Sequence, residues 1–369
     1  MIPILDLTRQ YAQLKAEIDA AAQAVFASGT FINGPQCQAF EAEFAAYAGT
    51  SHAVGLNSGT DALHLGLRAL GIGPGDEVIT SPFTFVATTE AIGMVGARPV
   101  FADIDPESYN VDPSSMEAAI TSRTRALIPV HLYGRPAPMR EIMAIARKYQ
   151  LAVVEDCAQA VGARSDGQLV GSFGDVGAFS FFPSKNLGAY GDGGIATTNR
   201  TDIAARLRSL RAHGGRVKYH HEELGTNSRL DELQAAILRV KLPHVGEWNR
   251  ARVEIAKRYS RELSDMLIVP EAAAGSGHVF HQYTIRVAAR EHVQARLSDR
   301  GIQTMIYYPV PLHLQAVHAD LGYRSGEFPH AEAAAREVLS LPMFPELLER
   351  EQDEVVRGVR ASAGVGAAV

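Results

Sequence analysis

Apolar residues in the first two thirds of the chain recur with two periods, one helical and one extended. The helical period appears in a stripe that ends at Gly29 and consists of Leu14, Ile18, Ala22 and Val25. Further helices are expected from Ser58, over 113–120 and over 139–149, and short apolar strands at 77–80, 99–102, 126–130, 152–154 and 178–182. Strands that are apolar throughout are buried on both faces, so the pattern predicts an α/β fold with a mostly parallel sheet between helices.

The pattern changes after Gly225. An amphipathic helix is marked by Leu230, Leu233, Ile237 and Val240 and stops at Pro243, and a second helix is expected over about 249–263. Candidate strands follow at 282–287 and 303–308. We therefore expect a large domain over 1–245 and a smaller C-terminal α/β domain over 246–369.

Composition narrows the function classes. The 369 residues are 46% apolar and 21% charged, which is typical of a globular enzyme, and the net charge of −6 gives no reason to expect a nucleic-acid partner. The N-terminal residues lack the charged and apolar regions of a signal peptide, and no apolar run approaches the ~20 residues of a membrane helix. We expect a cytoplasmic protein without a membrane partner.

Neither a metal nor a dinucleotide is expected from the motifs. The two cysteines, Cys37 and Cys157, form no CxxC pair, and the pair His220-His221 has no third ligand at a suggestive spacing. The glycines at 171–177 have GxxGxxG spacing, not the GxGxxG of a dinucleotide fold, and no Walker A motif occurs.

One lysine has an unusual setting. The apolar strand at 178–182 stops at Pro183, delivers Lys185, and is followed by a glycine-rich run at 188–194. A lone lysine on a polar turn is usually solvated, but this amine is expected at the rim of a core. Desolvation there lowers the pKa of a lysine, which is what a Schiff-base lysine needs, and a pyridoxal-phosphate (PLP) enzyme is the first hypothesis.

Other segments could complete such a site. The helix start at 58–61 offers free N–H groups to a phosphate; taken alone it is better explained by helix capping, and beside a Schiff-base lysine the phosphate site is favoured. The buried strand at 152–156 ends in Glu155 and Asp156, which point to opposite faces, so only one could sit beside a pyridine nitrogen; the alternative is a helix cap. Aromatics at 83–85 could stack on a ring or belong to the core.

These segments together resemble the DegT/DnrJ/EryC1/StrS family of PLP-dependent nucleotide-sugar aminotransferases, over nearly the whole chain. The landmarks are Asn57–Thr60, Pro74–Ile79, Thr84–Thr88, Glu155–Gln159, Ser184–Gly188, Gly191–Gly194 and Asn227–Ala236. The resemblance implies the aspartate-aminotransferase-like (fold type I) PLP fold, with a mostly parallel mixed sheet in the large domain. It also implies a homodimer whose subunits share active sites.

The resemblance assigns roles to residues of this sequence. Lys185 would form the Schiff base and carry the proton. The other cofactor contacts would be Asp156 at the ring nitrogen, Gln159 at the 3′-hydroxyl, Phe85 on the ring, Gly59, Thr60 and Ser180 at the phosphate, and Asn227 of the partner subunit. Substrate contacts would be Gly29, Phe31, Ser184, Arg229, Tyr307 and Tyr308. Many relatives have His-Tyr-Pro where this chain has Tyr307-Tyr308-Pro309, so part of the sugar-nucleotide site differs.

The implied reaction is a ping-pong transfer of an amino group from L-glutamate to the C3 keto group of a nucleotide-linked sugar, for cell-surface polysaccharide or secondary-metabolite synthesis. The favoured substrate is a UDP-2-acetamido-3-keto-uronate, as for UDP-2-acetamido-2-deoxy-ribo-hexuluronate aminotransferases. A dTDP-3-keto-6-deoxyhexose is the alternative.

Three other classes of protein fit the lysine less well. A sugar dehydratase of this fold has histidine in place of Lys185, and a cysteine desulfurase needs a cysteine on a mobile loop. A non-enzymatic regulator that binds PLP or a sugar nucleotide would not need the lysine.

Overall fold

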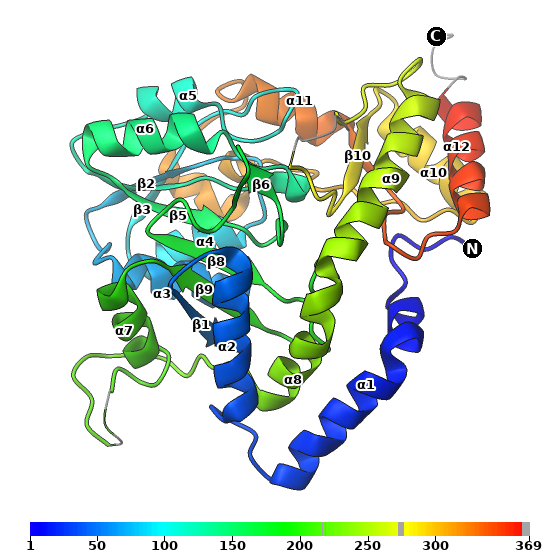
Figure 1. Ribbon diagram of the computed structural model, residues 1–369. Helices are drawn as coiled ribbons and strands as arrows, with labels where there is room; N and C mark the ends of the chain where they lie inside the picture. The colour runs from blue at the N-terminus through cyan, green and yellow to red at the C-terminus, as the bar shows by residue number, and fades with distance from the viewer. Residues whose placement is uncertain (216, 218, 272–276, 364–369) are drawn as a thin grey trace.

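The structure, a computed structural model, describes residues 1–215, 217, 219–271 and 277–363 (Figure 1). Its helices are α1 Leu7–Ser28, α2 Pro35–Ala48, α3 Gly59–Ala69, α4 Ala87–Met94, α5 Pro113–Ala118, η1 Leu132–Gly134, α6 Met139–Tyr149, α7 Thr201–Leu210, α8 Glu232–Lys241, η2 Leu242–His244, α9 Val245–Leu263, α10 Arg290–Asp299, η3 Leu312–Leu314, η4 Ala316–Leu321, α11 Pro329–Glu337 and α12 Glu349–Ala363. Its strands are β1 His52–Leu56, β2 Glu77–Thr80, β3 Arg98–Phe101, β4 Thr124–Ile128, β5 Ala152–Asp156, β6 Arg164–Ser165, β7 Gln168–Leu169, β8 Val176–Ser180, β9 Gly194–Thr198, β10 Tyr283–Arg286 and β11 Val338–Leu341.

The main sheet has seven strands in the order β1-β9-β8-β5-β4-β2-β3. The strands from β8 to β3 pair in parallel, and β9 pairs antiparallel with both β8 and β1. This mixed, mostly parallel sheet confirms the predicted α/β fold.

Helices bury both faces of this sheet, which is why its strands are apolar at every position. Val54, Val78 and Val154 pack on one face with α3, α4 and α7, whereas Ile79 and Leu127 pack on the other with α5 and α6. Around β8 and β9, that second face is covered by α2 and α8. Figure 1 shows α5 and α6 lying together on one side of the sheet, with α1 extending away from the body.

The C-terminal part has its own core. The antiparallel pair β10–β11 packs with α9, α10 and α12 around Tyr259 and Tyr283, and Ile2 joins this cluster through a bridge to Ile302. Helix α9 joins the two parts, since Trp248 packs in the core beneath α2 and Ile255 in the C-terminal core. The division into domains at residue 245 stays a prediction.

One expected strand differs from the structure. No strand forms over 303–308: Met305 makes a single bridge to Ser340, and the chain then turns so that Tyr307 and Tyr308 face a pocket. The partner of β10 is instead β11, which the sequence pattern did not reveal because it follows α11 directly. The helix predicted to stop at Pro243 does so: α8 ends at Lys241, and Pro243 lies in the 3-10 turn that links α8 to α9.

Among the described residues, no helix is both long and apolar enough to cross a lipid bilayer.

Candidate active site

A pocket of about 410 Å³ opens at the carboxyl edge of the parallel strands, where α/β folds usually bind ligands. Loops that follow β1, β2, β4, β5 and β8 supply most of its wall, and the C-terminal part closes it with His281, Gln282, Tyr307 and Tyr308. Chain segments far apart in sequence therefore meet at one place because parallel strands end at the same edge.

Lys185 reaches this pocket from the end of β8. A tight turn, closed by the bond from the Lys185 N–H to the Phe182 carbonyl at 2.8 Å, directs the chain across the sheet edge. Burial of the amine lowers the pKa of Lys185 to about 8, and the nearby carboxylate of Asp156 opposes this shift. Desolvation is the larger effect, so the amine is easier to deprotonate than an ordinary lysine.

A low pKa alone does not single out this lysine. Burial also lowers the pKa of Lys241 to about 8. The amine of Lys241, however, donates to the Gly188 carbonyl and lies 4.6 Å from the centre of the Tyr190 ring, and it does not line the pocket. Position in the pocket, and not the pKa, identifies Lys185.

Asp156 ends β5 and lines the same pocket while being only 6% exposed. Its carboxylate accepts hydrogen bonds from the Thr88 hydroxyl at 2.8 Å and from the Ala158 N–H at 3.1 Å. Burial raises the pKa of Asp156, and these two bonds and the Lys185 amine hold it down only in part. A buried carboxylate with neutral donors favours a cationic group beside it, as a protonated pyridine nitrogen would be.

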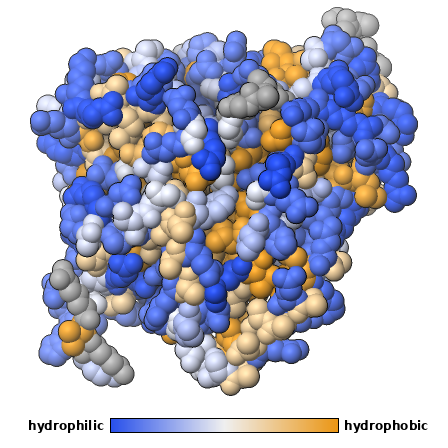
Figure 2. Space-filling model, in the orientation of Figure 1, coloured by the Kyte–Doolittle hydropathy of each residue, from blue (hydrophilic) through white to orange (hydrophobic). Residues whose placement is uncertain are grey.

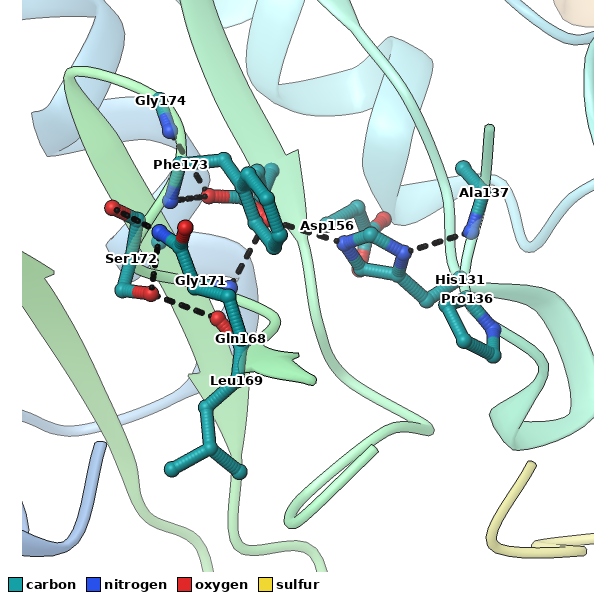
Figure 3. Close-up of polar contacts among 12 residues, drawn as sticks. His131, Pro136, Ala137, Asp156, Gln168, Leu169, Gly171, Ser172, Phe173 and Gly174 are labelled. Carbon is teal, nitrogen blue, oxygen red and sulfur yellow. Dashed lines mark hydrogen bonds and ion pairs between the residues drawn. The ribbon is translucent and has the colours of Figure 1, made fainter. Parts of the chain in front are cut away.

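Glu155 precedes Asp156 on β5, so its side chain points to the opposite face, where it anchors the strand. Figure 3 shows the residues around this anchor, among them His131, Gly171 and Phe173. Its carboxylate accepts bonds at 2.8 Å from the N–H groups of Gly171, Phe173 and Gly174, and one at 3.2 Å from His131 Nε2. His131 Nδ1 accepts from the N–H of Ala137 at 2.9 Å, so Nε2 carries the proton. These bonds fix the rotation of β5 and so hold Asp156 toward the pocket.

The same cluster contains ligand-type atoms of His131, Glu155 and Cys157 within 4.8 Å of one another. Both histidine nitrogens are engaged in hydrogen bonds, and burial raises the pKa of the Cys157 thiol well above its usual range. The geometry is that of a structural hydrogen-bond cluster, and we assign no metal to it.

The start of α3 also lines the pocket. Ser58 caps the helix by accepting from the Asp61 N–H at 3.1 Å, whereas the N–H groups of Gly59 and Thr60 have no hydrogen-bond partner among the described residues. A side chain at Gly59 would place its Cβ 2.7 Å from the Cβ of Ser180, so only glycine permits this approach. Free N–H groups at a helix start beside a serine suit a phosphate.

Aromatic rings line a third side. Phe85 is 56% exposed and lies 6.1 Å from Tyr308, ring centre to ring centre, whereas Phe83 is buried in the core. Gln159 donates from Nε2 to the Tyr308 hydroxyl at 3.1 Å, and its Oε1 accepts from the Tyr133 N–H at 2.6 Å. An exposed ring in a pocket wall offers a stacking surface for a flat ligand.

The structure divides the predicted site residues between two places. The pocket contains Gly59, Thr60, Phe85, Asp156, Gln159, Ser180, Ser184, Lys185, Tyr307 and Tyr308. The others, Gly29, Phe31, Asn227 and Arg229, do not line it. Phe31 lies beside the start of α8, because a bridge pairs Ile32 with Asp231 and the Phe31 carbonyl accepts from the Glu232 N–H, whereas Asn227 is bridged to Ala212.

Several residues at or beside the pocket had not been predicted from the sequence. Thr88 donates to Asp156 without lining the pocket itself, and its spacing of one helical turn from Thr84 could have suggested this position. His281 and Gln282 carry no such local signal, because only the packing of the C-terminal part brings them to the sheet edge.

These residues fit PLP on the chemistry of the donor set alone. The free N–H groups of α3 suit the phosphate, the buried carboxylate of Asp156 suits a protonated ring nitrogen, the exposed face of Phe85 suits the ring, and the amine of Lys185 suits the aldehyde. The fold and the pocket together define an α/β aminotransferase.

The chain belongs to the DegT/DnrJ/EryC1/StrS aminotransferase family, whose model matches residues 12–360. A solved structure, DesV of S. venezuelae in complex with a ketimine intermediate, is 47% identical with a TM-score of 0.96, and the match covers 98% of each chain. NtdA of Bacillus subtilis with bound cofactor PMP is 33% identical with a TM-score of 0.93, and the match covers 98% of this chain and 85% of that one. Family and cofactor class are thereby confirmed.

Curated relatives carry more than one functional name. A UDP-N-acetyl-3-dehydro-alpha-D-glucosamine 3-aminotransferase of Acidithiobacillus ferrooxidans is 52% identical over 97% of both chains. A UDP-2-acetamido-2-deoxy-3-oxo-D-glucuronate aminotransferase of Pseudomonas aeruginosa is 45% identical over 94% of this chain and 96% of the relative. A protein of Geobacillus stearothermophilus named a pleiotropic regulatory protein is 52% identical over 97% of both.

The lowered pKa of Lys185 predicts its reactivity. In protein freed of cofactor, competitive acetylation of Lys185 should rise with pH to a plateau with a midpoint of about 8, because the free amine is the reactive form. Lys148 is the matched control: it is exposed, and its ion pair with Glu117 raises its pKa, so its midpoint should lie above that of an ordinary lysine. Identical midpoints for the two lysines, read by mass spectrometry of their peptides, would contradict this assignment.

The anchoring role of Glu155 predicts a loss of stability. Glu155→Gln replaces an acceptor of three backbone N–H groups with a group that also donates, so the free energy of unfolding should fall by about 3 kcal/mol. Urea titration measures this. The control Glu254→Gln removes an exposed pair with Lys257 and should change stability by less than about 0.5 kcal/mol; equal effects of the two variants would refute the anchor.

Proposed function

We propose that this family member transfers an amino group from L-glutamate to the C3 keto group of a UDP-linked 2-acetamido sugar, with PLP held by the residues of the pocket. The proposal rests on one observation: the Lys185 amine and the Asp156 carboxylate line one pocket together with the free N–H groups of α3. That combination serves amino transfer on PLP and has no use in simple ligand binding.

Each residue of the pocket has a separate task in this proposal. Gly59, Thr60 and Ser180 would hold the phosphate, Asp156 the ring nitrogen, and Gln159 the ring hydroxyl. Phe85 would stack on the ring, and Lys185 would provide the attachment point. When bound, PLP supplies a conjugated ring that stabilises negative charge at the reacting carbon.

Lys185 then moves the proton. An amine with a pKa of about 8 is unprotonated in roughly a tenth of molecules at pH 7, against less than about a thousandth for an ordinary lysine. It can therefore take a proton from the substrate carbon and return it at the neighbouring position without a large cost in free energy. Thr88 and Ala158 hold Asp156 in place while this occurs.

The choice of sugar is supported by the relatives. Two of them are named for UDP-linked 3-keto sugars with a nitrogen substituent at C2. These two differ in name at C6, one a glucosamine and one a glucuronate, so we propose the UDP-2-acetamido-3-keto class and retain the uronate as the favoured member. A dTDP-3-keto-6-deoxyhexose stays the alternative.

The alternative is a regulatory protein that binds PLP or a sugar nucleotide but catalyses no reaction. It is considered because one relative is named a pleiotropic regulatory protein. A sensor has no need of a desolvated amine beside a buried carboxylate, so the pocket favours the enzyme. A desulfurase is disfavoured because the Cys157 thiol is buried and its pKa is raised well above the usual range. A cytoplasmic location, and the lack of a nucleic-acid partner, stay predictions.

We also propose a homodimer with shared active sites. The segment with Phe31 meets the segment that follows Arg229 through the bridge from Ile32 to Asp231, and none of Gly29, Phe31, Asn227 and Arg229 lines the pocket of the same chain. Phe26, Phe31 and Ile32 are exposed nearby, and Figure 2 shows apolar surface in the region of α1 and α8. A second copy covering this face would bring Asn227 and Arg229 of the partner subunit to the pocket.

Substrate assays test the reaction. With PLP and glutamate, the protein should aminate a UDP-2-acetamido-3-keto sugar at C3, with the product identified by mass and NMR, and with at least about tenfold higher kcat/KM than for dTDP-linked 3-keto sugars. Lys185→Ala should abolish turnover because it removes the proton carrier, whereas Lys148→Ala should keep it. Full turnover by Lys185→Ala, or no amination of any keto sugar, would refute the proposed function.

Mixing inactive variants tests the shared sites. Lys185→Ala and Asn227→Ala would each be inactive or weak alone, but coexpressed chains should form heterodimers in which one site has both residues intact. Random pairing then predicts recovery of about a quarter of the wild-type activity. No recovery, although mass spectrometry detects the heterodimer, would mean that the sites are not shared.

A further inference from the structure

A chain of buried amide and imidazole groups runs behind the pocket and ends beside Lys185. Asn249 on α9 donates from Nδ2 to the Val161 carbonyl at 2.9 Å, and Asn186 donates from Nδ2 to Asn249 Oδ1 at 2.8 Å. The Nδ1 atom of His281 lies 3.1 Å from Asn186 Oδ1. Asn186, Asn249 and His281 are each less than 10% exposed.

The direction of every bond in this chain follows from its first member. A backbone carbonyl can only accept, so the Asn249 amide nitrogen must face Val161, and its oxygen must accept from Asn186. Asn186 also donates from Nδ2 to the Val279 carbonyl at 3.2 Å, which confirms that its oxygen faces His281. The Nδ1 atom of His281 must therefore carry the proton.

The other ring nitrogen of His281 is left as an acceptor. Burial, together with the positive charges of Lys185 and Arg252, lowers the pKa of His281 well below its usual range, so the ring stays neutral. The amide nitrogen of Gln282, a donor, lies 3.5 Å from Nε2 of His281, which agrees with Nε2 being an acceptor. The ionisable groups that line the pocket with this ring are Asp156, Lys185, Asp192, Tyr307 and Tyr308, and Arg252 on α9 donates to the His281 carbonyl from behind.

The placement of this histidine links two parts of the pocket. His281 precedes β10 in the C-terminal part and lines the pocket together with Lys185. Its bonding partner Asn186 directly follows Lys185 in the chain and is itself tied to α9 through Asn249. The backbone that carries the reactive amine is thus held by groups from outside its own loop.

We propose that His281 is a positioning residue for the amino transfer: its Nδ1–H holds Asn186, and through Asn186 it holds the Lys185 amine at the reacting carbon. The neutral ring also keeps a second cation away from that amine. This role rests on the proposed function, because it concerns the same lysine, and it belongs to a residue that no local sequence pattern marks.

Substitutions of His281 separate positioning from mere packing. His281→Ala removes the bond to Asn186, so kcat of the PLP-loaded enzyme should fall by about 10- to 100-fold while KM for the sugar changes by less than about twofold. His281→Asn retains a donor at the position of Nδ1 and should recover most of this loss, whereas His281→Gln places its amide at the position of Nε2 and should not. His292→Ala, at an exposed histidine on α10, is the control and should behave as wild type.

Nitrogen NMR tests the geometry independently of any activity. In protein labelled with ¹⁵N-histidine, with the signal assigned by its loss in His281→Asn, the ring should show a protonated Nδ1, an unprotonated Nε2 and no titration between about pH 6 and 8. A protonated Nε2, or titration near the usual histidine pKa, would overturn the proposal, as would wild-type kcat in His281→Ala. Because the ring state can be correct even if no sugar is aminated, failure of this inference and failure of the proposed function are distinguishable.

Discussion

The structure depends on one constraint: an amine and a carboxylate must be kept out of water at the carboxyl edge of a parallel sheet. Burial lowers the pKa of Lys185 and raises that of Asp156. The amine is therefore easier to use in its neutral form, and the carboxylate favours a cationic group beside it. A pocket that let water reach these two groups would lose both pKa shifts. The anchors around these two groups, Glu155 behind β5 and Asn186 behind the lysine, are explained by this need for rigidity.

The fold supplies this edge through its topology. Parallel strands end at the same side, so loops from distant parts of the chain converge without long connections. Glycine at position 59 lets α3 approach β8 closely enough for its free N–H groups to face the pocket. The C-terminal part then closes the site from above, which excludes water from the amine and at the same time brings His281 to it.

Much of this could be predicted from the sequence because the signals are local. Apolar strands and helix stripes gave the sheet, and a strand that ends at a proline and a lysine pointed to Lys185. Segment 303–308 was wrongly expected to be a strand, because its contacts are tertiary and its apolar residues turn toward a pocket. The position of His281 could not be predicted, since it depends on packing between parts about 95 residues apart.

The central claim is that Lys185, and no other lysine, carries the cofactor. Reduction of the PLP-loaded protein with borohydride, followed by peptide mass spectrometry, tests it directly. We expect the cofactor mass on the peptide that contains Lys185, and none on that of Lys241, whose pKa is lowered to a similar value but which lies outside the pocket. Label on Lys241, or on neither lysine, would contradict the assignment of Lys185.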